Sequence, residues 1–545
     1  MPRALVEPRP RHLVDREPLP VDGAAADPVP PAAAPRRAAT PRPGASPPWP
    51  HRRRGWALAG LLLVGLLLRV EGLGDEPLAF HPARQYRSAV IARSMYLDAT
   101  RPADDPARQN AAAVTERMGV LEPPIIEAVA AGLYRVTGDE LWVPRLLNIG
   151  IWLIGAAALW SILGRLGSSV AQFVGTGLFV VLPMGVAASR AFQPDALMVG
   201  SALVAMALML RADERPGRGR TLGAAAAGGV SLLVKPMIGP LVLGWWLALI
   251  VTRQGWRGLL SRAHAAAAAV LVLPTVAFYA YGALTRESVG GWMGGSLLPE
   301  LFTQRGFYEA TLRTIDRAVP LPLVGLALLA TLVLDRRPRA LLGALWAGYV
   351  VFDAAVNYRT ATHDYYHLPL VAIVALALGL GGGVLVRRMA ATSFPAWLRT
   401  ASCAVVLAAL VGAAALVGGG ASSLEPPHGR GPEHVAANAR IGDLTGHSDR
   451  ILAVTPTYGA DLTYDGDVVS AEYPSPADAS LLAAQGDPVG SPATIIEASG
   501  ARWFAVTDVH TFAALPELQA ELRAHHRLVE RGEGWALWEL EDVPG

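Results

Sequence analysis

The chain has 545 residues, of which 52% are hydrophobic and 17% charged, and its formal net charge is +2. A mean hydropathy of +0.34 excludes an ordinary soluble protein, and so small a net charge gives no reason to expect a nucleic-acid partner. Because Cys403 is the single cysteine, no intrachain disulfide can form.

Residues 1–54 predict a disordered cytoplasmic tail. They are rich in Pro, Ala and Arg, lack hydrophobic periodicity and end in the basic cluster Arg52–Arg54. The first apolar run begins near residue 56 and ends in Arg69-Val70-Glu71, where a signal peptide would have small residues before its cleavage site. The run is therefore interpreted as a retained membrane helix.

Hydropathy predicts about eleven transmembrane helices within residues 55–420, each from a run of roughly 20 apolar residues. The fifth and sixth runs are short and are separated only by Lys235-Pro236, which predicts a tight hairpin. The runs lie near residues 55–71, 143–163, 168–187, 193–211, 221–235, 237–252, 264–284, 319–335, 339–356, 365–386 and 398–420.

The distribution of arginine orients these spans. Alternate short loops are dense in arginine, which predicts that they face the cytoplasm together with the N-terminal tail of a multi-pass protein of the plasma (inner) membrane. Residues 71–140 and all residues after about 421 then face outward. The arginine-rich loops contain Arg165, Arg211–Arg220, Arg253–Arg262, Arg336–Arg339 and Arg387–Arg399.

The outward loop 71–140 has two amphipathic segments of its own, Arg84–Leu97 and Ile125–Tyr134. The second follows Glu122-Pro123-Pro124, and proline is tolerated in the first turn of a helix because no backbone donor is needed there. Short amphipathic helices between spans are expected to lie along the bilayer surface. We expect them to cap a cavity whose walls are the spans.

Residues 421–545 differ from the rest of the chain and predict a small extracytoplasmic α/β domain. Ile451–Val454 and Trp503–Thr507 have the pattern of buried strands. Phe512–Ala524 has the pattern of an amphipathic helix, and Ala536–Leu540 that of a closing strand. The predicted fold class is an α-helical polytopic membrane protein that carries this domain.

Ionisable residues gather at the outward ends of the spans, whereas a transporter is expected to place charge near the bilayer midplane. Asp195 follows Gln193-Pro194 at the start of a span, where an acid also complements the helix dipole, so a structural and a catalytic role are both open. Glu122 has apolar neighbours that can raise its pKa and suit it to act as a base, with Glu127 as a weaker rival.

Several cations on the outward side are candidate ligands for a phosphate. Lys235 lies between Val234 and Pro236 in apolar sequence, where lysine can either snorkel or hold a phosphate as a point charge. The further candidates of this kind are Arg84, Arg145 and Arg190, with His81 and Gln85 beside them.

His363-Asp364-Tyr365-Tyr366-His367 superficially matches a zinc-protease pattern. Pro369 places the start of the helix near Tyr366, so the two histidines are not expected to share a helix face. An interfacial aromatic belt and a pocket for a sugar or phosphate, with Tyr365, Tyr366 and His367, are the alternatives. The residues require no metal, although a divalent cation is left open as a cofactor.

Short motifs follow one another on the outward side in a characteristic order. They are Leu68-Arg69, Ile91-Ala92-Arg93, Pro123-Pro124, Arg145-Leu146, Gln193-Pro194-Asp195, Lys235-Pro236 and Tyr365-Tyr366-His367-Leu368-Pro369-Leu370. Over residues 55–390 this order resembles the GT-C membrane glycosyltransferases of the protein mannosyltransferase and aminoarabinose transferase type, glycosyltransferase family 39.

The resemblance implies transfer of a sugar from a polyprenyl-phosphate-linked donor to a hydroxyl of a glycan, lipid or protein on the outer face. It also implies that an acid of the first outer loop activates the acceptor while basic and tyrosine side chains hold the lipid phosphate. The family usually has Asp-Glu where this chain has Arg84-Gln85, and His-Pro where it has Glu122-Pro123. This departure favours Glu122, then Asp195, as the base, unless catalysis has been lost.

Two other function classes stay open beside a glycosyltransferase. One is a transporter or flippase for a lipid-linked saccharide, which would use the same outer cavity without making a bond. The other is a membrane scaffold whose outer domain binds a partner. Charge gathered at one interface favours the enzyme, whereas the missing Asp-Glu favours the other two.

Overall fold

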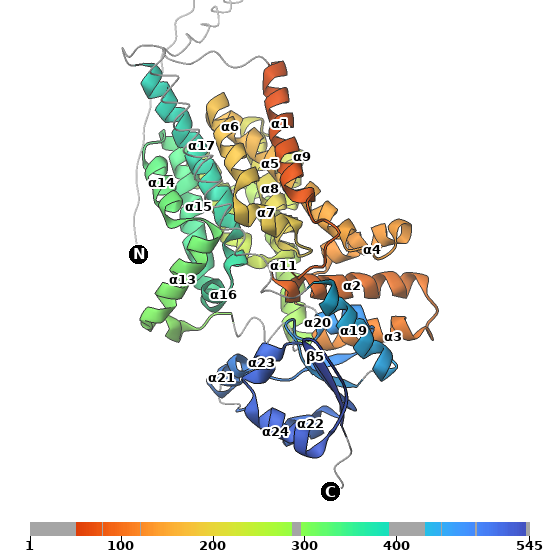
Figure 1. Ribbon diagram of the computed structural model, residues 1–545. Coiled ribbons are helices and arrows are strands. Elements are labelled where there is room, and N and C mark those ends of the chain that lie inside the picture. Colours follow the sequence, from red (N-terminus) through yellow and green to blue (C-terminus); the bar gives the residue numbers. More distant parts are fainter. Residues whose placement is uncertain are drawn as a thin grey trace, which may run out of the picture. The chain divides into compact units, whose positions relative to one another are not determined.

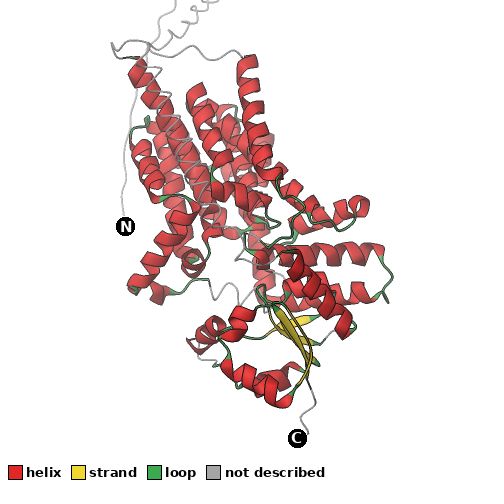
Figure 2. Cartoon of the chain, in the orientation of Figure 1, coloured by secondary structure: helices red, strands yellow, loops and turns green. Residues whose placement is uncertain are grey.

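The structure is a computed structural model and describes residues 51–78, 80–119, 121–285, 296–391, 431–447, 450–484 and 488–540. Residues 51–391 are helical in their secondary structure, and the described strands all lie after residue 450 (Figure 2). The helices of the apolar region are α1 (His51–Val70), α5 (Trp142–Leu166), α6 (Ser169–Val181), α7 (Pro183–Arg190), α8 (Asp195–Glu214), α9 (Arg218–Val234), η1 (Pro236–Ile238), α10 (Gly239–Gln254), η2 (Trp256–Leu260), α11 (Arg262–Thr285), η3 (Pro299–Thr303), α13 (Arg305–Ala318), α14 (Leu321–Leu332), α15 (Arg336–Ala355), α16 (Asn357–Thr362), η4 (Asp364–His367) and α17 (Leu368–Ala390).

A helix lies at each predicted span up to residue 390, and the last predicted span, 398–420, is outside the described residues. By length and composition, five described helices can cross a membrane, or up to seven if each of two bent helix pairs is one span. The count of about eleven is therefore not confirmed. The predicted span 168–187 is two helices, α6 and α7, which meet at 57° because Pro183 cannot continue the α6 hydrogen-bond ladder.

Ion pairs join loops that the arginine pattern had predicted to share one side. Asp213, near the end of α8, lies 3.2 Å from Arg253 at the end of α10 and 2.5 Å from Arg337 at the start of α15. Arg165 of α5 pairs with Glu214 of α8. Residues far apart in sequence thus meet at one end of the bundle, while the loop 71–140 begins at the other end of α1 (Figure 1).

The loop 71–140 holds three helices, α2 (Pro82–Thr100), α3 (Pro106–Met118) and α4 (Ile125–Thr137). The two predicted amphipathic segments are α2 and α4. The sequence analysis missed α3, whose few apolar residues leave Ala111 and Val114 as its buried positions. The Asp105 side chain caps α3 by accepting a hydrogen bond from the Arg108 amide, and Pro106 is the first residue of the helix. The sequence therefore did contain the residues that mark the start of a helix.

The C-terminal domain has a five-stranded sheet in the order β2-β1-β3-β5-β4. Strand β1 pairs in parallel with β2 and β3, while β5 is antiparallel to both β3 and β4. The predicted strands are β1, β3 and β5; the predicted helix 512–524 instead begins at Pro516, after the short α23. The elements are α19 (Pro432–Thr445), β1 (Ile451–Val454), α20 (Ala460–Gly466), β2 (Ser470–Glu472), α21 (Pro476–Ala484), α22 (Pro492–Ser499), β3 (Trp503–Val506), α23 (Val509–Ala513), α24 (Pro516–His525), β4 (Arg527–Gly532) and β5 (Trp535–Glu539).

Helix α20 packs on α2 of the loop 71–140. The Arg93 guanidinium lies 3.5 Å from the centre of the Tyr464 ring, and the Tyr86 hydroxyl donates to Asp465 at 3.3 Å. Tyr86 and Tyr464 belong to one apolar cluster that also contains Tyr134 of α4 and Phe192. Helix α2 is therefore held by the C-terminal domain on one side, and it contributes Arg84 to the site described next.

Candidate functional site

Four charged residues predicted to face outward form one buried cluster, which we call the charge cluster: Arg84, Glu122, Asp195 and Lys235. Lys235 Nζ lies 2.8 Å from Asp195 Oδ1 and 3.5 Å from Glu122 Oε1. Arg84 Nη2 donates to both Glu122 oxygens, at 3.0 and 3.1 Å. The two candidate catalytic acids and two of the candidate phosphate ligands are thus brought together.

Local sequence determines where each member begins. Asp195 is the first residue of α8, directly after Pro194, and Lys235 is the residue at which α9 stops before Pro236. Arg84 is in the first turn of α2, after Pro82, and Glu122 precedes Pro123-Pro124 ahead of α4. Gly155 of α5 allows close packing of α8, since a Cβ there would lie 3.1 Å from Gly200 Cα. Four helix ends or turns consequently converge.

Aromatic side chains of η4 cover the charge cluster. The ring centres of Tyr365 and Tyr366 lie 5.3 and 5.2 Å from Lys235 Nζ, within the range of a cation–π contact. His81 contacts Tyr365 edge to face at 4.6 Å and shares a 2.7 Å hydrogen bond with Asp364. Three more of the predicted site residues therefore lie around the charge cluster.

The partners of Glu122 overturn the expected direction of its pKa. Burial by itself would raise the pKa of Glu122, but Arg84 and Lys235 outweigh burial and lower this pKa below its ordinary value. The expectation of a raised pKa rested on apolar neighbours in sequence, whereas both cations come from other elements. Glu122 is an ionised carboxylate here.

Two buried polar atoms of the charge cluster are available to a ligand. Within the described residues, Arg84 Nε and Asp195 Oδ2 have no hydrogen-bond partner, so each can bind a ligand.

Other residues predicted to bind a phosphate instead form hydrogen bonds with backbone groups of the loops. Gln85 donates to Phe80 O at 2.9 Å and accepts the Phe192 amide at 3.1 Å, which ties α2 to the segment before Asp195. Arg145 donates to the Leu73 carbonyl at 2.9 Å, and Arg190 donates to the carbonyl of Glu71. Their predicted contact with a phosphate stays a prediction.

His367 is fully buried away from the charge cluster. Its Nδ1 is 2.6 Å from the Tyr349 hydroxyl, and its Nε2 is 3.0 Å from both Thr314 Oγ1 and Thr360 O. These contacts join α13, α15, α16 and η4. The sequence analysis placed His367 in a pocket for a sugar or phosphate, and contact with a phosphate held by Arg84 and Lys235 would require His367 to leave these partners.

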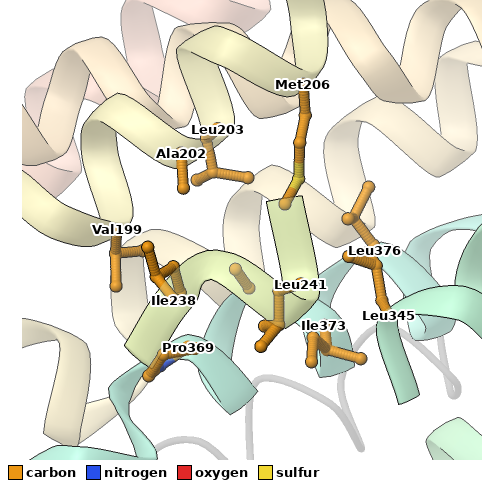
Figure 3. A pocket seen from close by; sticks show the side chains of 11 residues that line it. Val199, Ala202, Leu203, Met206, Ile238, Leu241, Leu345, Pro369, Ile373 and Leu376 are labelled. Atoms are coloured by element: carbon orange, nitrogen blue, oxygen red, sulfur yellow. The ribbon is translucent and has the colours of Figure 1, made fainter. Parts of the chain in front are cut away.

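Two cavities have lining residues in or close in sequence to the charge cluster. The first is wholly apolar and is lined by residues of α8, η1, α10, α15 and α17, of which Val199 and Ile238 are nearest the cluster in sequence (Figure 3). The second is polar, lies mainly in the loop 71–140 and is bordered by Arg84, Glu122 and Pro194. In the described part of the chain, no three His, Cys, Asp or Glu side chains are grouped to hold a metal ion.

Sequence reasoning did not find Ser88 and Arg87, which line the second cavity with Glu127. Ser88 is one helical turn after Arg84, so the spacing of α2 would have placed both on one face. The Ser88 hydroxyl donates to Glu127 at 2.7 Å. Arg87 donates to the carbonyls of Met118 and Gly119 and closes the end of α3.

Comparisons with known proteins agree with this architecture. The family model described as dolichyl-phosphate-mannose-protein mannosyltransferase matches residues 121–281, less than a third of the chain, and this part includes Glu122, Asp195 and Lys235. No curated protein matches the chain in sequence.

Solved structures match over most of the chain. ArnT from Cupriavidus metallidurans bound to undecaprenyl phosphate is 16% identical with a TM-score of 0.54, and the match covers 89% of this chain and 98% of that one. AglB, an archaeal oligosaccharyltransferase from Archaeoglobus fulgidus in complex with an inhibitory peptide and a dolichol-phosphate, is 12% identical with a TM-score of 0.56, over 90% and 75%. The arabinofuranosyltransferase AftD from Mycobacteria is 15% identical with a TM-score of 0.50, over 91% and 40%. At these identities the likeness shows the fold.

Proposed function

We propose that this chain, whose fold is that of the GT-C membrane glycosyltransferases, transfers a sugar from a polyprenyl-phosphate-linked donor to an acceptor hydroxyl on the extracytoplasmic face. The fold resemblance expected from the motif order is confirmed. The proposed donor is inferred from two sources. One is the chemistry of this site, and the other is that ArnT was solved with undecaprenyl phosphate and AglB with a dolichol-phosphate.

The observation that carries the proposal is the charge cluster, which borders the polar cavity and is about one helical turn in sequence from residues that line the apolar cavity. Val199 of the apolar cavity is one helical turn after Asp195, and Ile238 follows Lys235 in η1. Pro369, another lining residue of the apolar cavity, is about one helical turn after Tyr366. A lipid phosphate suits this arrangement, because its chain needs apolar walls and its head needs cations at their edge.

Arg84 and Lys235 are the proposed phosphate ligands. Arginine can offer parallel N–H donors, including the buried Nε that has no partner among the described residues, and lysine acts as a point charge. The charge cluster is neutral as it stands, with two cations and two carboxylates. An arriving phosphate must therefore compete with Glu122 and Asp195 for the same cations.

Glu122 and Asp195 accordingly have a positioning role in this proposal. They hold Arg84 and Lys235 in place before the donor binds, so little conformational freedom is lost when the phosphate arrives. A phosphate that displaces Glu122 from Arg84 and Lys235 would remove the cause of its lowered pKa. The role of Glu122 or Asp195 as a base, expected from the sequence, stays a prediction. The positive charges of Arg84 and Lys235 then stabilise the negative charge that develops on the phosphate as it leaves.

The test is a transfer assay with the purified full chain in lipid nanodiscs and in vesicles. A panel of polyprenyl-phosphate-linked hexoses and pentoses is supplied with glycan, lipid and peptide acceptors, and release of free polyprenyl phosphate is measured. We expect release with at least one donor. Movement of the intact lipid-linked saccharide between vesicle leaflets, without release of polyprenyl phosphate, would instead show a flippase.

A further inference from the structure

The polar cavity of the outer loop contains an acid that the phosphate site does not use. The cavity lies among α2, α3 and α4, with polar side chains from each helix and apolar walls from Ile91, Met95 and the prolines 123, 124 and 194. Arg84 and Glu122 of the charge cluster form its border. A ligand in this cavity would therefore contact the charge cluster at Arg84 and Glu122.

Glu127 is the acid in question. It is in the first turn of α4 and is 6% exposed. The Ser88 hydroxyl of α2 donates to its Oε1 at 2.7 Å, and no ion pair to Glu127 occurs among the described residues. Glu122 and Asp195 differ from it in this respect, since both are paired with cations.

We propose that Glu127 takes the proton of the acceptor hydroxyl, and that the polar cavity of α2, α3 and α4 binds the hydroxyl-bearing end of the acceptor. This inference rests on the proposed glycosyl transfer. The cavity suits a sugar or another polyol, because its polar groups can meet several hydroxyls while its prolines and Ile91 pack against the ring.

The step conserves atoms and charge. The acceptor oxygen forms a bond to the anomeric carbon as its proton passes to the Glu127 carboxylate. The bond from the anomeric carbon to the phosphate oxygen breaks, and the electron pair leaves with the polyprenyl phosphate. Arg84 and Lys235 receive the additional negative charge of that phosphate. The Glu127 carboxyl then loses its proton to solvent.

The charges around Glu127 suit the role of a base. Burial raises the pKa of Glu127 to about 7, and the Ser88 hydrogen bond opposes this rise. The facing charged groups are Arg84 and Arg87 from α2 and Glu122 from the turn before α4; none of the lining residues comes from α5, which packs behind α4. A base is most effective when its pKa is near the working pH, whereas the lowered pKa of Glu122 makes a weak proton acceptor.

The first experiment reads the protonation state of Glu127 without any substrate. Dicyclohexylcarbodiimide reacts with protonated carboxylic acids in apolar surroundings, so the full chain is treated at pH values from 5 to 9 and labelled residues are located by tandem mass spectrometry. We expect Glu127 to be labelled below about pH 7 and spared above it. Ser88→Ala should move this midpoint up by about one pH unit, the size expected of one hydrogen bond to a charged group, and Ser88→Thr should restore it. Labelling independent of pH, or absent throughout, would contradict the proposal.

The second experiment measures donor consumption against pH with the donor that the wild type uses. Glu127→Gln should lose at least a hundredfold in turnover, the usual contribution of a general base, while polyprenyl-phosphate affinity changes less than twofold. Glu116→Gln, at an exposed acid of α3, is the matched control and should keep the wild-type rate. Ser88→Ala should shift the acid limb of the profile upward. A wild type that consumes no donor contradicts both proposals, whereas a Glu127→Gln variant with the wild-type rate and profile contradicts only the role of Glu127.

Discussion

Lys235 Nζ lies 2.8 Å from Asp195 Oδ1, and each side chain is 1% exposed. This pair joins the end of α9 to the start of α8 across 40 residues of sequence. Burial of two charges is costly, and it is tolerated here because each compensates the other and because Glu122 adds a second partner for the lysine. The pair therefore contributes to the stability of the two helix ends. It also neutralises part of the Lys235 charge that a ligand would otherwise meet.

Breaking this pair on one side should destabilise the protein more than removing it altogether. Lys235→Met leaves Asp195 without its cation and should cost about 3–5 kcal/mol of unfolding free energy. Lys235→Met combined with Asp195→Asn should regain a large part of that loss. Equilibrium unfolding of the detergent-solubilised wild type, of Lys235→Met and Asp195→Asn alone and of the double variant measures the coupling, and strictly additive effects would show that the two residues are not coupled.

Phosphate recognition should depend on Arg84 and Lys235 and not on the loop-bracing arginines. Arg84→Met and Lys235→Met should each weaken polyprenyl-phosphate binding by about ten- to a hundredfold, which corresponds to one hydrogen bond to a charged group. Binding of neutral polyprenol should barely change. Arg145→Met is the comparison, because the Arg145 side chain donates to the backbone carbonyls of Leu73 and Asp75. Equal loss of both ligands would make Arg84 and Lys235 packing elements.

Glu122→Gln should separate binding from transfer. Removal of one carboxylate leaves the charge cluster with a net positive charge, so polyprenyl phosphate should bind more tightly, by about tenfold. Transfer should nevertheless fall, since Arg84 loses the partner that holds it. Titration calorimetry and donor consumption test the two halves. Unchanged binding together with abolished transfer would indicate that Glu122 acts as the base.

The predicted sidedness of the chain can be tested with introduced cysteines. In a Cys403→Ala background, Gly217→Cys should be protected from an impermeant thiol reagent on intact cells, and Ala493→Cys should be labelled. Both positions are exposed, and a Cβ at Gly217 would lie 3.9 Å from the Arg220 guanidinium, its nearest neighbour among the described residues. The reverse pattern would place the charge cluster on the cytoplasmic side.

Asp465 should make the stability of the C-terminal domain depend on pH. Burial raises the pKa of Asp465 to about 7, whereas the same residue ionises near pH 4 in an unfolded chain. The folded state therefore holds the proton more tightly, and stability falls as pH rises between these two values. Asp465→Asn can still accept hydrogen bonds from Tyr86 and Asn438, so its advantage in thermal unfolding should grow from about pH 4 and level off above pH 7. An advantage that is the same at every pH would contradict this assignment.

Local sequence was enough to predict the regular elements, because hydropathy and periodicity act within one segment. The apolar runs are helices as far as residue 390, the two segments predicted as helices between residues 71 and 140 are α2 and α4, and β1, β3 and β5 are strands. The errors occurred where an element has little hydrophobic signal, as in α3, or where proline divides a run, as at Pro183 and Pro516.

The arginine pattern also predicted that Arg84, Glu122, Asp195 and Lys235 share one side of the membrane. It carried no information on distance, since no term in hydropathy couples a turn of α2 to the ends of α8 and α9. Tertiary packing brings the four side chains within ion-pair reach, and the nearby cations then lower the pKa of Glu122, although its sequence neighbours alone would raise it. Packing likewise lets Gln85 accept a hydrogen bond from the Phe192 amide, in the segment before Asp195, and buries Glu127 against Ser88 of α2. Coulomb energy and desolvation depend on separation in space, so these properties of the site became visible only in the folded chain.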